Sequence, residues 1–226
     1  MENRKHLIFL SGFLLTELIL YVLILKESGK LLVVSSFAAI ALCFVYALVN
    51  LKRSSTFIVA GLACTVAADV FLVVCSPIQR LWGMVFFTLA QTMYAIKLHL
   101  ESRNKKILVA RVALTVAIEL AAVIILKDKL DVLAAVSVCY YANLFVNIIE
   151  AFTVFKKGRL FAVGLVLFLL CDTVIGLQVM SQLYLQIPES SIVYKILFMP
   201  FNLSWFFYLP AQVLIALSGK VKRREE

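Results

Sequence analysis

The sequence predicts an all-α fold, a polytopic membrane helix bundle. Of its 226 residues, 63% are hydrophobic and only 15% are charged, whereas soluble domains have about 45–50% apolar and about 25% charged residues. One soluble core cannot hide so much apolar surface, because domains of roughly 150–300 residues leave about a quarter to a third of their surface exposed. The apolar residues form continuous runs without the alternation of transmembrane strands. Together these observations exclude a soluble enzyme, a disordered chain and a disulfide scaffold.

Eight apolar runs are long enough to cross a membrane, which takes about 20 residues. Each is bounded by charged residues or by Gly, Ser or Pro. The expected spans are residues 7–25, 30–51, 55–75, 80–100, 106–126, 131–154, 160–180 and 192–218. Because the loops between the runs are short, residues 1–226 are expected to be a single transmembrane domain without a soluble domain.

The first run follows Arg4 and Lys5 and so resembles a secretory signal peptide. It is long, however, and it carries Glu17. It ends in Lys26-Glu27-Ser28-Gly29-Lys30 without a small-residue cleavage site, so we expect a retained helix.

The net charge of +9 is unevenly shared between the two ends of the expected bundle. The end with the N-terminus carries 14 cations, namely Arg4, Lys5, Lys52, Arg53, Arg103, Lys105, Lys106, Lys156, Lys157, Arg159, Lys220, Lys222, Arg223 and Arg224. The opposite end carries six, namely Lys26, Lys30, Arg80, Lys127, Lys129 and Lys195. The positive-inside rule then predicts cytoplasmic N- and C-termini in a multi-pass cell-membrane protein. We interpret the basic residues as a girdle that meets anionic membrane lipids, and we expect no nucleic-acid partner.

Short motifs recur between the two halves of the chain. Gly61-Leu62 precedes Asp69 with the spacing by which Gly164-Leu165 precedes Asp172, and Glu17-Leu18 and Ala90-Gln91 return as Glu119-Leu120 and Ala211-Gln212. Four matches in the same order predict two four-helix repeats, about 7–100 and 106–218. Since four spans return the chain to the same side, the repeats are expected to be parallel.

Four acidic residues are expected near the membrane midplane. At a rise of about 1.5 Å per residue, Glu17, Asp69, Glu119 and Asp172 lie about 15, 21, 20 and 18 Å from the cytoplasmic ends of their spans. A charge at the bilayer centre costs about 2.5–3.5 kcal/mol, so each acid is a functional candidate. No basic residue shares that depth, so the acids cannot all ionise, and a neutral acid beside an ionised one suits acid–base chemistry. The alternative is that each is a protonated helix-packing residue.

Other polar residues follow single helical faces. The sixth span carries Tyr140, Asn143, Asn147 and Glu150, the fourth carries Thr88, Gln91 and Tyr94, and the eighth carries Ser204, Tyr208 and Gln212. Such stripes could line a cavity that binds hydroxyls or a headgroup. Equally, Glu150 could form an ion pair with Arg111. Pro200 and Pro210 in the last span are tolerable where a cavity or a neighbour satisfies the carbonyls that they free.

Motifs of other enzyme classes are missing from the sequence. It contains no phosphate-binding Gly loop, GxSxG or HExxH, and two histidines near helix ends make a Ser-His-Asp triad a poor fit. The five cysteines lie within apolar runs without metal-binding spacing, so we expect them to pack as small apolar residues: Cys43, Cys64, Cys75, Cys139 and Cys171.

The motif regions around Asp69, Gln91, Asp172 and Gln212 resemble the YhhN-like lysoplasmalogenase family of eight-span proteins. The carrying segments are Ala60-Gly61-Leu62 through Asp69-Val70, Phe87 through Tyr94, Gly164-Leu165 through Thr173, and Tyr208-Leu209-Pro210-Ala211-Gln212. The resemblance implies an ether hydrolase of lipid metabolism that cleaves the vinyl ether bond of lysoplasmalogens. It implies a lysophospholipid substrate, no cofactor and no metal, and Asp69 and Asp172 as the catalytic pair. One departure from the family pattern is Gln91. The family usually has a histidine at this position, and glutamine, unlike histidine, cannot titrate.

The expected substrate-binding residues are Gln91, Tyr94, Tyr208, Gln212, Asn143, Asn147, Glu119 and Glu17. The main alternative is a proton- or cation-coupled transporter or lipid carrier that uses the same midplane acids. Against it, we expect neither half to have a broken helix at its acid. A divalent-cation site built from the four carboxylates and a structural or receptor-like bundle are further alternatives. The sequence leaves the oligomeric state open.

Overall fold

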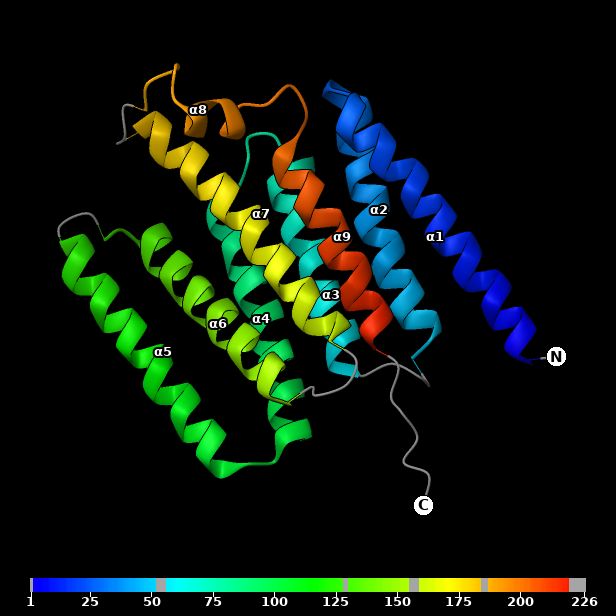
Figure 1. Cartoon of the computed structure of the whole chain (residues 1–226), viewed down its shortest axis with the longest axis horizontal. Coiled ribbons are helices and arrows are strands. Elements are labelled where there is room, and N and C mark those ends of the chain that lie inside the picture. The colour runs from blue at the N-terminus through cyan, green and yellow to red at the C-terminus, as the bar shows by residue number, and fades with distance from the viewer. Residues whose placement is uncertain (1, 52–55, 128–129, 155–158, 184–186, 220–226) are drawn as a thin grey trace.

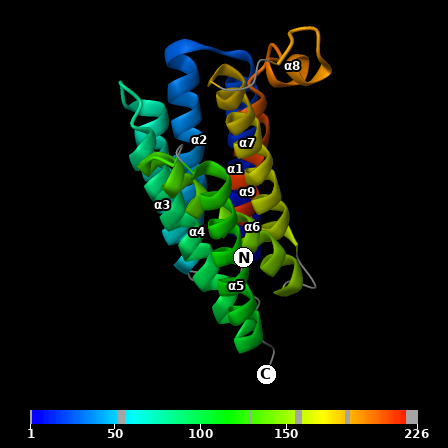
Figure 2. The same ribbon diagram turned by 90° about the vertical axis from the view of Figure 1, so that its left-hand side faces the viewer.

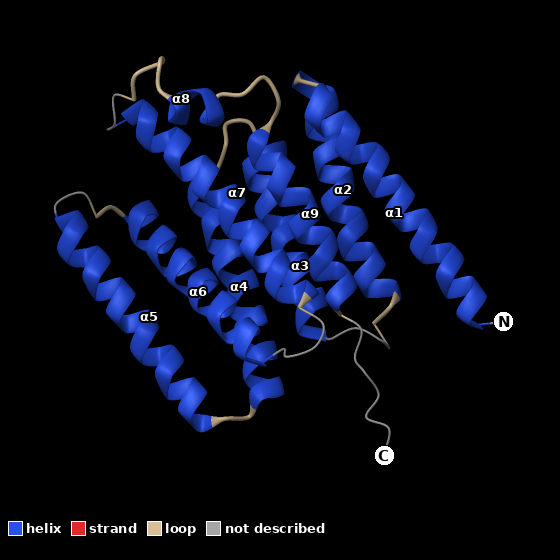
Figure 3. Cartoon of the chain, viewed as in Figure 1, coloured by secondary structure: helices blue, strands red, loops and turns tan. Residues whose placement is uncertain are grey.

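The structure is a computed structural model that describes residues 2–51, 56–127, 130–154, 159–183 and 187–219. Within these ranges it contains helices, loops and turns without strands (Figure 3). The helices are α1 (Glu2–Lys26), α2 (Gly29–Val49), α3 (Thr56–Asp69), η1 (Val70–Val74), α4 (Arg80–Ser102), α5 (Lys105–Leu126), α6 (Val132–Val154), α7 (Leu160–Leu183), α8 (Ile192–Leu197) and α9 (Leu203–Ser218). Seven described helical segments are long and apolar enough to cross a membrane, and α9 is a shorter apolar helix. The chain is therefore a multi-pass integral membrane protein.

The centre of the bundle is formed by α3, α4, α7 and α9 (Figures 1 and 2). There α3 packs along α4, and α7 packs along α9. Helices α2 and α6 flank this centre, while α1 and α5 lie at the outside. The candidate span of α5 has no buried residue, and apolar side chains such as Val109 and Ile125 are exposed on it. In a bilayer this surface faces the acyl chains, which explains why the outward face of α5 is apolar, whereas Arg111 and Glu119 contact α6.

Helix α1 begins and α9 ends at the same end of the bundle (Figure 1). We call this the terminal end, and α8 lies at the opposite end. Many of the basic residues used to predict orientation lie outside the described residues, namely Lys52, Arg53, Lys129, Lys156, Lys157, Lys220, Lys222, Arg223 and Arg224. That the terminal end is cytoplasmic therefore stays a prediction.

The expected eighth span, 192–218, is wrong in its extent because it forms two helices, α8 and α9. Pro200 lies between them, and proline removes a backbone donor and disfavours helix in the preceding residue. Asn202 then starts α9, its side chain accepting a hydrogen bond from the backbone N–H of Trp205 at 3.4 Å. The 16 residues of α9 rise only about 24 Å, less than the roughly 30 Å of a hydrocarbon core.

The second proline of this region, Pro210, lies inside α9 without ending it. Because proline has no N–H, it leaves the carbonyl of Phe206 without its usual partner four residues on. The hydroxyl of Tyr21 in α1 donates a hydrogen bond to that carbonyl at 3.1 Å. The expectation that a neighbour satisfies the freed carbonyl is confirmed at this position, and the bond ties α1 to α9.

The expected third span, 55–75, is not a uniform α-helix. Helix α3 ends at Asp69, and the next five residues form the π-helical segment η1. The backbone N–H of Cys75 donates to the carbonyl of Val70 at 2.8 Å, five residues back instead of four. The span stays helical from Thr56 to Val74, so the helix is not broken at Asp69, but its hydrogen-bond pattern changes there. π-helical segments are rare and occur frequently at functional sites.

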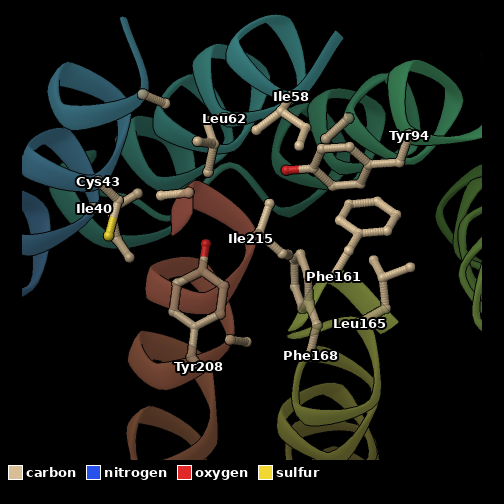
Figure 4. Close-up of a cluster of buried hydrophobic side chains, with 14 of the residues drawn as sticks. Ile40, Cys43, Ile58, Leu62, Tyr94, Phe161, Leu165, Phe168, Tyr208 and Ile215 are labelled. Carbon is tan, nitrogen blue, oxygen red and sulfur yellow. The ribbon is translucent and has the colours of Figure 1, made fainter. Parts of the chain in front are cut away.

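Two glycines allow the central helices to approach closely. A Cβ added at Gly61 of α3 would lie 2.2 Å from the ring of Tyr94 in α4. A Cβ added at Gly164 of α7 would lie 2.9 Å from Ile215 and 3.1 Å from the backbone oxygen of Ala211, both in α9. Figure 4 shows Tyr94 beside Phe161, and Ile215 near the same cluster. Small residues at such crossings are typical of membrane helix pairs.

Candidate active site

Asp69 lies at the junction of α3 and η1, where it is only 3% exposed. Its Oδ2 accepts a hydrogen bond of 2.8 Å from the hydroxyl of Tyr208 in α9. The predicted substrate-binding residue Tyr208 is therefore in direct contact with one of the two predicted catalytic residues. A buried carboxyl group needs such a partner, because an unpaired polar group in an apolar surrounding is costly.

Asp172 lies in the middle of α7 and is 8% exposed. Its Oδ2 accepts a hydrogen bond from the hydroxyl of Tyr140 in α6. The hydroxyl of the next residue, Tyr141, donates to the backbone oxygen of Asp172 at 2.8 Å. Two neighbouring tyrosines of α6 thus hold both the side chain and the backbone at this position.

The carboxyl groups of Asp69 and Asp172 lie in the same local environment. Tyr208, which binds Asp69, and Tyr140, which binds Asp172, both contact the ring of Phe168. The ring of Phe168, one turn before Asp172, lies 5.3 Å from the ring of Tyr208 and 6.4 Å from the ring of Tyr140. Helices α3, α6, α7 and α9 therefore bring the two aspartates and their tyrosines into one aromatic-lined region.

Phe87 of α4 forms an aromatic wall together with Phe168, Tyr140 and Tyr208. Its ring centroid lies 5.8 Å from that of Tyr140, 5.5 Å from that of Phe168 and 6.3 Å from that of Tyr208. On the far side of Tyr208, the ring of Trp205 lies 5.0 Å away. The wall gives the aspartates a low-dielectric surrounding, in which electrostatic interactions are stronger than in water.

A second cluster of polar side chains includes Gln91, which lies one turn after Phe87 on α4. Asn147 of α6 is fully buried and donates to both the backbone oxygen and the Oε1 of Gln91, each at 2.9 Å. Its own Oδ1 accepts from Arg111 of α5 at 2.6 Å, and Arg111 forms an ion pair with Glu150. The ion pair that the sequence offered as an alternative is confirmed, and it extends into a hydrogen-bonded group that includes Gln91.

Gln212 occupies the corresponding position on α9, one turn after Tyr208. It is fully buried, and among the described residues neither its Oε1 nor its Nε2 has a hydrogen-bond partner. The Nε2 of Gln91 likewise has none in this part of the chain. Buried amide atoms without partners are rare in native proteins, so both glutamines are candidates for contact with a polar ligand.

The two glutamates belong to the outer helices, and each contacts a cysteine of the next helix. The Oε1 of Glu17 in α1 accepts a hydrogen bond of 3.3 Å from the thiol of Cys43 in α2. Glu119 in α5 is partly buried and interacts with Cys139 of α6. Within the described ranges, no three His, Cys, Asp or Glu side chains are arranged to hold a metal ion. The four-carboxylate cluster considered from the sequence is therefore not formed.

Two further predicted binding residues have local roles in packing. The ring of Tyr94 fills the space beside Gly61 and meets the ring of Phe161 edge-on at 5.5 Å. The side chain of Asn143 donates to the backbone oxygen of Cys139 in its own helix, at 3.0 Å. Binding of a ligand by these two residues stays a prediction.

Tyr140 is the site residue that the sequence-based set of binding residues missed. The sequence did contain a signal for it, because Tyr140 begins the polar stripe of the sixth span. What the stripe does not reveal is that its first member contacts Asp172 while its later members, Asn147 and Glu150, contact Arg111. One helical face therefore serves two distinct groups of polar residues.

Comparison with known proteins gives one match. The family model of the YhhN family matches residues 30–219, which include both aspartates, both glutamines and all four central helices. No curated protein and no solved structure matches the chain.

Proposed function

The chain belongs to the YhhN family, which includes lysoplasmalogenases, and we propose that it is an intramembrane hydrolase that cleaves the vinyl ether bond of lysoplasmalogens. The products are a fatty aldehyde and a glycerophospho-alcohol. One observation carries the proposal. Asp69 and Asp172, two buried aspartates from different helices, are each hydrogen-bonded to a tyrosine, and the two tyrosines contact the same phenylalanine rings.

The chemistry requires one neutral and one ionised carboxyl group. The neutral acid transfers its proton to the vinyl carbon that is not bonded to oxygen, and an oxocarbenium ion forms. The ionised carboxylate stabilises this cation and takes a proton from the water that attacks it, as in two-carboxylate glycosidases. The resulting hemiacetal collapses to aldehyde and alcohol. Two carboxyl groups in one apolar region suit this division, because mutual repulsion disfavours ionisation of both.

Tyr208 and Tyr140 have positioning roles in this proposal. Each holds its aspartate by a hydrogen bond to Oδ2, which leaves Oδ1 of the same carboxyl group for substrate or water. Phe87 and Phe168 exclude water from around the oxocarbenium ion. Gln91 and Gln212, one turn away along their helices, orient the ether oxygen and the glycerol hydroxyl.

We also propose that the halves 7–100 and 106–218 are parallel repeats. Three correspondences support this. Helix α3 packs along α4 as α7 packs along α9. The glycine eight residues before each aspartate, Gly61 or Gly164, is a point of close approach between the two helices of that pair. Each outer helix also places a glutamate, Glu17 or Glu119, against a cysteine of the following helix. The two aspartates are then equivalent positions of a duplicated unit.

A transporter or lipid carrier is the second candidate, and the π-helical segment η1 favours it. Interrupted helices at intramembrane acids are typical of transporters, and α3 changes its hydrogen bonding directly after Asp69. A transporter moves its substrate unchanged, however, so the two functions differ in whether a product forms.

Product formation is tested with purified protein in detergent or lipid nanodiscs. We expect aldehyde release from a 1-alkenyl lysophospholipid and none from the 1-alkyl ether of the same chain length and headgroup, which lacks the vinyl double bond. Release of no aldehyde from the alkenyl lipid, together with its protein-dependent movement across a vesicle membrane, would support the carrier instead.

A further inference from the structure

Arg111 connects the outermost helix to the centre of the bundle. It lies on α5, but its guanidinium reaches α6, where Nη2 donates to Asn147 and Nη1 to Glu150. The side chain of Arg111 is only 10% exposed. Asn147 continues the contact to Gln91 of α4. A continuous line of hydrogen bonds therefore runs from Arg111 on α5, near the terminal end of the bundle, to the middle of α4.

Gln91, at the inner end of this line of hydrogen bonds, has a side-chain N–H donor that is not used. Gln91 is fully buried, and its Nε2 has no hydrogen-bond partner among the described residues. Phe87, Gln91 and Tyr94 share one face of α4, at spacings of four and three residues. Since Phe87 contacts both Tyr140 and Tyr208, the unused donor lies about 6 Å along the helix axis from the aspartate site.

We propose that this line of residues is the headgroup site of a lysophospholipid, with the phosphate held by Arg111 and the glycerol hydroxyl by Gln91 and Asn147. The inference rests on the proposed function, because it places the vinyl ether at Asp69 and Asp172. Along α6, Asn147 lies about 10 Å from Tyr140, a separation that the glycerophosphate group would cover together with the long side chains of Arg111 and Gln91. The line also extends toward only one end of the bundle, so it fixes the direction in which the lipid lies.

The chemistry of arginine suits a phosphate here. Guanidinium carries five N–H donors in a planar fork that matches phosphate oxygens. In the described part of the chain, the bonds to Asn147 and Glu150 use one donor on each terminal nitrogen. Glu150 balances the charge of Arg111 when no lipid is bound. The headgroup then lies toward the terminal end and the alkenyl chain toward the opposite end, so the substrate comes from the leaflet at the terminal end.

Binding of non-cleavable lipids tests this inference without catalysis. The ligands are a 1-alkyl lysophosphatidylethanolamine and the 1-alkylglycerol of the same chain, bound to the purified full-length protein in detergent. Their affinities are read from the fluorescence of Trp205, which lies against Tyr208, with the second tryptophan, Trp82, replaced by phenylalanine. We expect the phospholipid to bind more tightly than the alkylglycerol.

Two variants break the same ion pair in different ways. Arg111→Gln removes the guanidinium, and we expect the phospholipid to lose roughly tenfold or more in affinity while the alkylglycerol is unaffected. Glu150→Gln keeps the guanidinium and should preserve the preference for the phospholipid. Arg111→Lys should retain part of it. Equal loss of preference in Arg111→Gln and Glu150→Gln would mean that the ion pair only fixes α5 in place, and it would overturn the inference.

Further experiments distinguish a lipid phosphate from free phosphate. They also distinguish failure of the headgroup site from failure of the proposed hydrolysis. Inorganic phosphate or glycerol 3-phosphate should compete weakly with the alkyl phospholipid, and strong competition would show a site for free phosphate instead of a lipid headgroup. Preserved phospholipid preference without any aldehyde release would contradict the proposed hydrolysis alone. Aldehyde release with no effect of Arg111→Gln on binding would contradict the headgroup site alone.

Discussion

Tyr208 donates a hydrogen bond of 2.8 Å to the carboxyl group of Asp69, across 139 residues of sequence. Tyr140 makes the equivalent bond to Asp172 from a different helix. Each aspartate is thus oriented by a tyrosine from another part of the chain, and the two tyrosines contact the same phenylalanines, Phe87 and Phe168. This arrangement makes the relative placement of α6 and α9 as important for the site as the aspartates themselves.

Removal of either tyrosine hydroxyl should slow aldehyde release. Hydrogen bonds to charged groups contribute about 1.5–3 kcal/mol, so Tyr208→Phe and Tyr140→Phe should each lower kcat roughly tenfold to a hundredfold. Tyr46→Phe is the matched control, because Tyr46 is also buried but stacks on Phe13 away from the aspartates. Initial rates with a 1-alkenyl lysophospholipid measure the effect. A loss in Tyr46→Phe as large as in the site variants would point to a general effect on folding.

The proposed proton transfer to carbon has an isotopic consequence. In D2O, the aldehyde should carry one deuterium on the carbon next to the carbonyl, because the neutral aspartic acid delivers a solvent-derived proton there. Mass spectrometry of the trapped aldehyde counts this deuterium, and aldehyde incubated in D2O without enzyme corrects for exchange. An aldehyde without enzyme-dependent deuterium at this carbon would exclude the mechanism.

Removal of metal ions should leave the reaction unchanged. The proposed steps use only carboxyl groups and water, and the described residues contain no group of three or more potential ligands in a metal-binding arrangement. Aldehyde release is compared before and after treatment with a chelator. Inactivation that added divalent cations reverse would replace the two-aspartate account with a metal-dependent one.

Close packing of α3 on α4 should make Gly61 intolerant of substitution. A methyl group at this position would lie 2.2 Å from the ring of Tyr94, so Gly61→Ala should lower the unfolding free energy by about 1–3 kcal/mol. Gly12→Ala in α1 meets no atom within 4 Å and should be neutral or slightly stabilising. Unfolding in mixed micelles measures both. Equal stability of the two variants would show that Tyr94 moves aside at no cost.

The bond between Tyr21 and the carbonyl freed by Pro210 can be tested by a double-mutant cycle. Tyr21→Phe should cost about 0.5–1.5 kcal/mol, because it leaves the carbonyl of Phe206 without a partner. In a Pro210→Ala background the restored N–H satisfies that carbonyl, so the same change should cost less. Strict additivity of the two substitutions in unfolding measurements would mean that Tyr21 does not compensate for the proline.

The sequence predicted most of the fold because apolar runs of sufficient length have few alternatives to membrane helices. It missed where the last span begins, since residues 197–201 are apolar throughout and only Pro200 marks the break between α8 and α9. It also missed η1, because no residue type specifies a π-helical turn after Asp69. Both depend on how the neighbouring helices pack.

Prediction of the site addressed the depth of each residue but not its position in the membrane plane. Counting along the spans placed four acids near the midplane, and two of them, Glu17 and Glu119, belong to outer helices. Depth follows from the number of residues in a span, whereas lateral position depends on which helices pack together. The contact between Tyr140 and Asp172 is missing from the sequence-based prediction for the same reason.

The central claim is that Asp69 and Asp172 together hydrolyse the vinyl ether. It is tested most directly by aldehyde release from a 1-alkenyl lysophospholipid with Asp69→Asn and Asp172→Asn, next to the wild-type protein. The two-aspartate mechanism predicts that each variant folds, as shown by its thermal unfolding, and that each releases no aldehyde above background. Wild-type rates in both folded variants would contradict the claim.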